Sequence, residues 1–185
     1  MLAAMNLPGH SSPAAGFDAP LQMLEACHQR LQRQCDTLRR MLPHVAAHGS
    51  DANAREAAQA VMRYFDKAAV DHHADEEEDL FPALLEAMAG SDAVCLRELV
   101  GTLTRQHREL EAHWHALRRV LAAIAAGEQV ALPAALVERL IDGYAAHLAR
   151  EDAELLPMAE RLIDDTTLQR IGQAMRQRRG IAEGS

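Results

Sequence analysis

The feature that most constrains this chain is a short pattern that occurs twice, at residues 72–82 (HHADEEEDLFP) and at residues 147–157 (HLAREDAELLP). Each copy has a histidine, a glutamate four residues later, a leucine eight residues later and a proline ten residues later. Residues four apart lie on one face of a helix, so each copy projects an imidazole and a carboxylate to the same place. Such a pair is half of a site for iron, manganese or zinc. Two pairs on facing helices therefore predict a site for two metal ions.

The first copy contains two adjacent histidines, His72 and His73, and each has a glutamate four residues later. Only His72 also has the proline at the tenth position, as His147 has. The shared register therefore selects His72 and Glu76 as the counterparts of His147 and Glu151.

The composition predicts an all-α fold. Hydrophobic residues make up 49% of the 185 residues, much of this fraction is alanine, and aromatic residues make up only 3%. Alanine favours helices, whereas the β-branched residues that favour strands are scarce.

Charge and hydropathy exclude several classes of partner. The formal net charge of −8 argues against nucleic acid, because phosphate binding needs basic patches. No apolar run approaches the roughly 18 residues of a membrane span, and the N-terminus lacks the basic and apolar regions of a signal peptide. The three cysteines form no disulfide framework. We expect a cytoplasmic protein.

The hydrophobic spacing predicts four long helices within residues 18–162, after a flexible tail at residues 1–17 and before a short fifth helix and tail at residues 163–185. In each long helix, apolar residues recur every three or four positions, as in the seam of a helical bundle. The expected boundaries are a start near Asp18–Pro20 and an end at Pro43, a cap at Ser50 or Asp51, a kink at Pro82, a break at Gly90–Asp92, an end at Gly127, a start near Pro133 and a start near Thr166.

Each long helix has one histidine in its apolar seam, and two helices add a glutamate. Six buried ionisable groups without a lysine or arginine in the seams would be costly to desolvate, and metal cations would offset this cost. Four imidazoles and two carboxylates suit two iron ions, which the carboxylates can bridge. The six residues are His28, His72, Glu76, His107, His147 and Glu151.

The remaining charged residues near these seams have simpler explanations. The other acidic residues of the first copy lie largely off the seam and are expected on a solvated face. The basic residues at the end of the fifth helix suit the helix dipole, so they need no ligand. The acidic set is Asp71, Asp75, Glu77, Glu78 and Asp79, and the basic set is Arg176, Arg178 and Arg179.

Over roughly residues 18–162 the sequence resembles the hemerythrin-like, or HHE cation-binding, domain family. The most specific part is the phrase Glu76-Glu77 followed by Leu80-Phe81-Pro82. The resemblance implies an up-down-up-down four-helix bundle around a non-haem diiron centre, with or without an oxo or hydroxo bridge, in which manganese or zinc can substitute for iron. The residues that match the family's ligands by position are His28, His72, Glu76, His107, His147 and Glu151.

The sequence departs from oxygen-carrying hemerythrins at Glu111. Those proteins have a histidine four residues after the ligand of the third helix, whereas here Glu111 stands four residues after His107. Residues four apart share nearly the same helix face, so Glu111 is a further candidate ligand. A third carboxylate would favour ferric iron and would occupy the position where dioxygen binds. The sequence therefore argues against reversible oxygen carriage.

These observations favour a diiron protein that reacts with or senses dioxygen, nitric oxide or peroxide. The alternative is iron storage, or iron delivery for the repair of iron centres. Whether the protein is an enzyme stays open: a two-metal hydrolase finds no HExxH motif, and only residues 25–28 supply the Glu-x-x-His of a ferritin-like ferroxidase. Sensing would require a separate redox or signalling partner, and a homodimer is also compatible with the sequence. A metal-free interaction module would leave the buried charges uncompensated.

Overall fold

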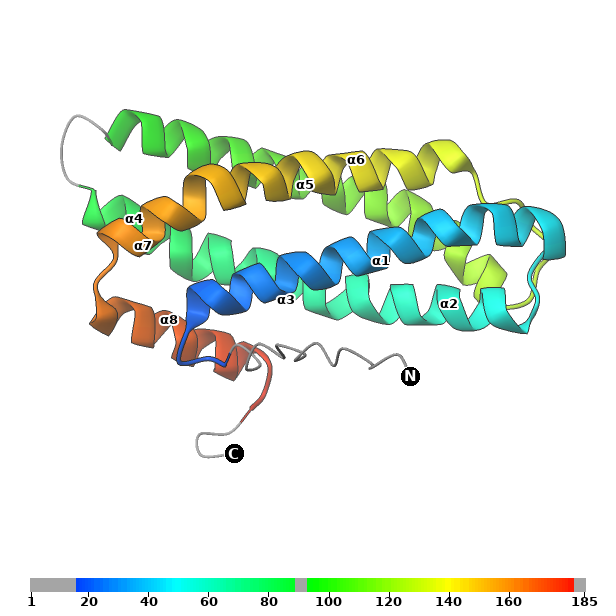
Figure 1. Ribbon diagram of the computed structural model, residues 1–185, viewed down its shortest axis with the longest axis horizontal. Helices are drawn as coiled ribbons and strands as arrows, with labels where there is room; N and C mark the ends of the chain where they lie inside the picture. The colour runs from blue at the N-terminus through cyan, green and yellow to red at the C-terminus, as the bar shows by residue number, and fades with distance from the viewer. Residues whose placement is uncertain (1–15, 89–92, 182–185) are drawn as a thin grey trace, which may run out of the picture.

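The computed structural model describes residues 16–88 and 93–181, and every element in these ranges is helical (Figure 1). The elements are α1 (Pro20–His48), α2 (Ala52–Arg63), the π-helical turn η1 (Tyr64–Ala68), α3 (Ala69–Ala74), the π-helical turn η2 (Asp75–Leu80), α4 (Phe81–Ala87), α5 (Ala93–Ala125), α6 (Ala134–Arg150), the π-helical turn η3 (Glu151–Leu155), α7 (Leu156–Leu162) and α8 (Asp165–Arg178).

Four helical runs make up the bundle: α1, the continuous run from α2 to α4, α5, and the continuous run from α6 to α7. The runs pack in a ring, with α1 against α2, α2 against α5, α5 against α6, and α6 against α1. Consecutive runs are antiparallel, and the short helix α8 packs against one end of the bundle (Figure 1). The predicted up-down-up-down four-helix bundle with a short fifth helix is confirmed.

The helix boundaries follow the predicted capping residues with one exception. Asp51 caps α2 by accepting a hydrogen bond from the backbone N–H of Ala54 at 2.8 Å, and α6 begins directly after Pro133. The predicted end of the first helix at Pro43 is wrong, because α1 continues to His48. Pro43 removes one backbone hydrogen bond, but buried apolar residues on both sides of it hold the helix in the core. The break predicted at residues 90–92 lies outside the described residues.

Both copies of the sequence repeat contain a π-helical turn that ends two residues before their proline. In η2 the N–H of Phe81 bonds to the carbonyl of Glu76, and in η3 the N–H of Leu156 bonds to the carbonyl of Glu151. A proline lacks the N–H that a regular helix needs and crowds the preceding turn, so irregular hydrogen bonding is expected on its N-terminal side. The irregularity expected at Pro82 is therefore a π-turn that begins beside the candidate ligand.

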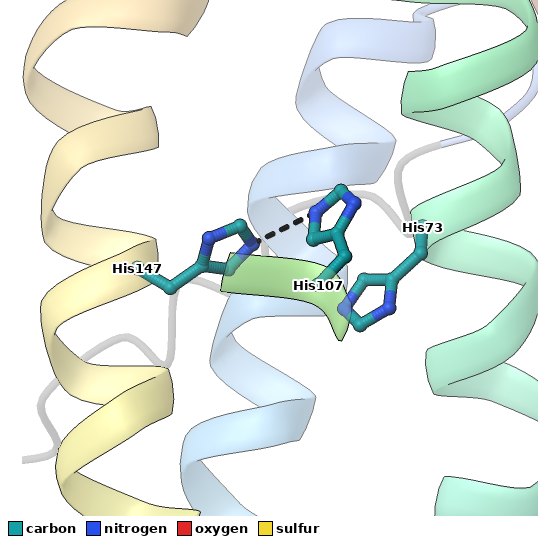
Figure 2. Close-up of side chains that lie close together, drawn as sticks. All are labelled: His73, His107 and His147. Atoms are coloured by element: carbon teal, nitrogen blue, oxygen red, sulfur yellow. Dashed lines mark hydrogen bonds between the residues drawn. The ribbon is translucent and has the colours of Figure 1, made fainter. Parts of the chain in front are cut away.

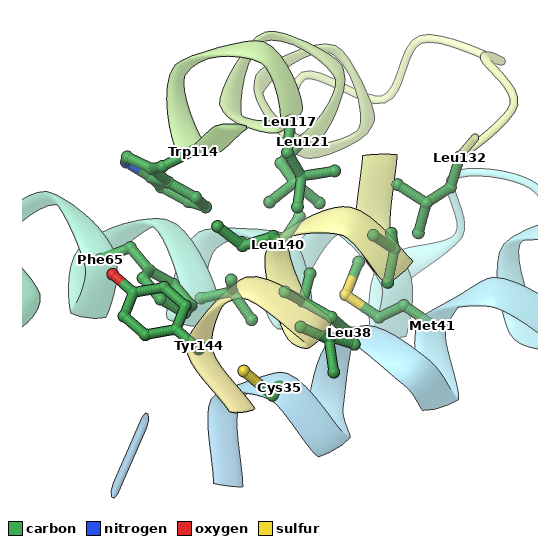
Figure 3. Packing of buried hydrophobic residues seen from close by; sticks show 14 of the residues in the cluster. Cys35, Leu38, Met41, Phe65, Trp114, Leu117, Leu121, Leu132, Leu140 and Tyr144 are labelled. Carbon is green, nitrogen blue, oxygen red and sulfur yellow. The ribbon is translucent and has the colours of Figure 1, made fainter. Parts of the chain in front are cut away.

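The bundle core has two apolar clusters with a polar layer between them. The larger cluster includes Leu38, Phe65, Trp114 and Tyr144 (Figure 3), and the smaller one lies toward α4, α7 and α8. Five candidate ligands fall between the residues of these two clusters along their helical runs, and His147 directly precedes Leu148, the last residue of the larger cluster on its run. The five are His28, His72, Glu76, His107 and Glu151. The apolar residues of these two clusters face inward. No helix in the described ranges is long and apolar enough to cross a membrane. The fold thus encloses the polar layer on both sides.

Helix α8 is attached to the bundle by ion pairs that the sequence analysis did not predict. Asp75 in η2 is fully buried, and its carboxylate accepts hydrogen bonds from Arg178 and, at 2.6 Å, from Nη2 of Arg179. Arg178 also bonds to Glu78 and Asp79, at 2.8 Å in both cases. These arginines therefore have a second role beside the helix dipole, because both of them neutralise the buried carboxylate of Asp75.

The predicted solvated acidic face is correspondingly smaller than expected. Asp71 is only 6% exposed, and its carboxylate lies 2.7 Å from the ammonium of Lys67. Glu77 is partly buried, whereas Glu78 is exposed as predicted. The π-turn η2 changes the direction in which Asp75 and its neighbours project, so a regular helical period does not place them correctly.

Candidate metal centre

The structure brings six of the seven candidate ligands together in the polar layer. Each helical run contributes at least one of them, and none of their side chains is more than 3% exposed. The six residues are His28 on α1, His72 on α3, Glu76 in η2, His107 on α5, His147 on α6 and Glu151 in η3.

The two carboxylates lie between two pairs of histidines. Glu76 Oε1 is 3.4 Å from Nε2 of His72, and Glu76 Oε2 is 3.2 Å from Nε2 of His107. Glu151 Oε2 is 3.2 Å from Nε2 of His28, and Glu151 Oε1 is 2.9 Å from Nε2 of His147. Each carboxylate therefore directs one oxygen to each histidine pair, so both glutamates contribute donor atoms at both pairs.

The donor atoms form two overlapping groups, each within 4.8 Å. One group contains His28, His72 and both glutamates, and the other contains His107, His147 and the same glutamates. Nε2 of His107 and Nε2 of His147 are 3.1 Å apart (Figure 2). Two imidazole nitrogens bound at about 2.0–2.1 Å to one ion lie roughly 3 Å apart when they meet at a right angle. The spacing and chemistry of these donors fit a shared metal ion.

Two of these histidines are held by carboxylates outside the cluster, which contact Nδ1, the ring nitrogen that does not face the glutamates. His28 Nδ1 lies 2.7 Å from Asp152 Oδ1, and His107 Nδ1 lies 2.7 Å from Glu77 Oε1. Donation from Nδ1 to a carboxylate leaves Nε2 free to bind a metal and increases its basicity. The sequence analysis missed this role, but the repeat contains the signal: an acidic residue follows the candidate glutamate in both copies.

Burial and neighbouring charges move the pKa values of these groups in different directions. Burial lowers the pKa of His28 and of His107, but the nearby carboxylates outweigh it and raise the two values to about 9 and about 10. Burial lowers the pKa of His72 to about 3. Burial and the charge of Glu151 raise the pKa of Glu76 to about 8. At Glu151 the surrounding histidines outweigh burial and hold its pKa well below the usual range.

We expect metal-free protein to lose stability as the pH rises from about 7 to about 10. The folded-state pKa values of His28 (about 9) and His107 (about 10) exceed the usual 6.5, so their stabilising protonation is complete below pH 6.5 and is lost through pH 9–10. Glu76 acts in the same direction, because its raised pKa also favours a protonated folded state. Bound metal replaces these protons. Thermal melts should show that chelation lowers the melting temperature by at least about 5 °C more at high pH than at neutral pH; parallel curves would contradict this.

The structure does not bring Glu111 into the cluster. Its side chain is 56% exposed, and Oε1 lies 3.6 Å from Nε2 of His115. The buried seam of α5 continues from His107 through Leu110 to Trp114, so the position four residues after His107 lies beside the seam. The expectation that Glu111 binds metal and blocks the position for dioxygen is not supported by this arrangement.

Replacing Glu111 with glutamine should therefore leave the metal content and metal affinity within about twofold of the parent. Among the residues that the structure describes, the ion-pair partner of this exposed side chain is His115, not one of the six buried donors. Surface substitutions of this kind change stability by roughly 0.5 kcal/mol or less. Metal analysis and a metal titration of the Glu111→Gln variant test this. Loss of one ion per chain would show that Glu111 turns inward when metal binds.

A four-helix bundle with a buried layer of histidines and glutamates defines a class of helical cation-binding proteins. The sequence family of the hemerythrin HHE cation-binding domain matches residues 19–159 of this chain. The chain is also 30% identical over 169 residues to an uncharacterized protein of Haemophilus influenzae, an alignment that covers 91% of this chain and 95% of that protein. The chain belongs to the hemerythrin HHE cation-binding family, as the sequence analysis predicted.

Proposed function

We propose that the protein holds two iron ions and uses them to react with, or to sense, dioxygen, nitric oxide or peroxide. The observation that supports this most directly is the orientation of Glu76 and Glu151, each with one oxygen toward either histidine pair. Mixed imidazole and carboxylate ligation without a thiolate suits iron, with manganese or zinc as substitutes. Bound iron would supply one-electron and dioxygen chemistry.

The protein's own residues suit a retained, reactive centre better than a store of exchangeable iron. None of the six side chains is more than 3% exposed, and carboxylates from neighbouring positions hold two of the histidines in place. Release of iron would require these buried side chains to move away from one another inside the bundle. A small molecule can approach the centre without such a movement, because a cavity of about 250 Å³ reaches from the surface to His73, beside His107.

Iron loading under anaerobic conditions tests how many iron ions the protein binds and which histidines hold them. We expect about two iron ions per chain, and His72→Ala and His147→Ala should each weaken one of the two positions. His115→Ala is the matched control, since this histidine is 62% exposed and lies outside the cluster. Fewer than about one iron per chain, with no loss in the two ligand variants, would contradict the proposal.

Exposure of the reduced, iron-loaded protein to dioxygen, nitric oxide and hydrogen peroxide tests the reaction. We expect at least one of them to change the optical spectrum within seconds, without loss of iron from the protein. If instead none reacts and iron passes readily to a competing chelator, the protein would serve iron storage or delivery.

A further inference from the structure

His73 lies beside the candidate metal centre, although the repeat does not select it. Its ring stacks on that of His107, with centroids 4.0 Å apart and planes 12° apart, and its centroid lies 5.9 Å from that of His147 (Figure 2). One nitrogen from each of these three histidines fits within a group whose members are at most 4.8 Å apart. His73 is thus a third imidazole on the α5 and α6 side of the centre.

The buried Nε2 of His73 has no hydrogen-bond partner among the described residues. A buried polar atom without a partner costs about 1–3 kcal/mol. Nε2 of His72, a residue that faces the centre, is unpartnered in the same way. The common feature of the two atoms is a nitrogen lone pair or N–H that the protein does not use.

Adjacent residues can both face the centre because of the shape of the bundle. Consecutive residues of a helix project about 100° apart, and the two neighbours of one helix in a four-helix ring lie in directions roughly at right angles. His72 faces α1, where its ring meets that of His28 at 5.0 Å, and His73 faces α5, where its ring stacks on that of His107. The two adjacent histidines thus lie at opposite ends of the centre, His72 beside His28 and His73 beside His107.

The position of the second metal ion has room for a further donor. His107 and His147 share it with one oxygen each from Glu76 and Glu151, which gives four donor atoms. Glu111 does not reach this position. Iron sites with imidazole and carboxylate ligands accept more than four donors.

We propose that His73 binds the metal ion held by His107 and His147, as the fifth imidazole of the centre. This inference rests on the proposed two-metal function. His73 would be the third imidazole at the position of His107 and His147. It would come from the run from α2 to α4, whereas the position of Glu111 that the sequence analysis considered lies on α5.

The ring of His73 must turn to bind. Two rings that bind one ion both contain that ion near their planes, so the parallel, offset stack on His107 has to open. The donor group of 4.8 Å must also contract to at most about 4.2 Å, twice a typical metal–nitrogen distance. The adjoining cavity of about 250 Å³, which His73 lines together with Trp114 and Tyr144, provides space for this rotation.

The test is a titration of metal-free protein with cobalt(II), whose visible absorption reports the number of bound ligands. In His73→Ala we expect one ion to bind as in the parent and the second to bind at least about tenfold more weakly, with altered absorption. Imidazole, which can enter through the cavity, should restore both the affinity and the absorption of the variant. His115→Ala, the exposed control, should behave as the parent.

Three results would overturn the inference. If His73→Ala does not differ from the parent and the control in affinity or absorption, His73 does not bind the metal. A weakened second position that imidazole does not restore would mean that the substitution acts through packing. If His73→Ala fails to fold by circular dichroism, His73→Gln replaces it, and unchanged metal binding in that variant excludes ligation. Failure of the parent to bind two ions would instead contradict the proposed function.

Discussion

Replacing Glu151 with glutamine should remove both metal ions together, whereas loss of a single histidine should weaken only one. Glu151 directs Oε2 to His28 and Oε1 to His147, which belong to different histidine pairs. Glutamine keeps the shape of the side chain but removes its charge, and it turns an N–H donor toward one of the two positions. The buried metal charges would then lose half of their bridging carboxylate charge.

The expected affinity loss is more than about 100-fold at both positions, since changes to residues that only support ligands already cost about 10–100-fold. Metal analysis after dialysis, followed by a calorimetric titration, measures the stoichiometry and the affinity. Glu154→Gln is the matched control, because this glutamate lies three residues further along the same run, is 55% exposed and pairs with Arg150 at 3.4 Å. A variant that loses only one ion would show that Glu151 does not bridge.

The sequence was sufficient to predict the bundle and six residues of the candidate centre because both depend on helical periodicity. Polar residues at seam positions must be buried if the helix packs at all. The seam of α5 also shows the limit of this reasoning. Glu111 is one turn from His107 in the sequence, but Leu110 takes the buried position, and a helical period alone does not decide between neighbours three and four residues away.

Other features could not be predicted from local patterns. Pro43 ends a helix by the usual rule, yet Met41 and Val45 are 3% and 5% exposed, and their burial keeps α1 intact to His48. The π-turns depend on hydrogen-bond register, which side-chain spacing does not report. The pairing of Asp75 with Arg178 joins residues 103 positions apart, so only the folded structure brings them together.

Removing the two arginines that attach helix α8 to the bundle should strongly destabilise the protein. The carboxylate of Asp75 is fully buried, and burial raises its pKa even though Arg179 and Arg178 act to lower it. Removing both arginines would leave this carboxylate in the interior without a cation. Breaking a buried ion pair in this way costs about 3–5 kcal/mol.

We therefore expect the Arg178→Ala/Arg179→Ala variant to unfold with a free energy about 3–5 kcal/mol lower than the parent in urea titrations at neutral pH. Arg176→Ala is the matched control, because this arginine lies 3.5 Å from the exposed Asp18, and an exposed pair contributes at most about 1 kcal/mol. Adding Asp75→Asn to the double variant should recover much of the loss, since the buried charge is then absent. A double variant as stable as the control would mean that α8 is held by its apolar contacts alone, and that water reaches Asp75 once the arginines are removed.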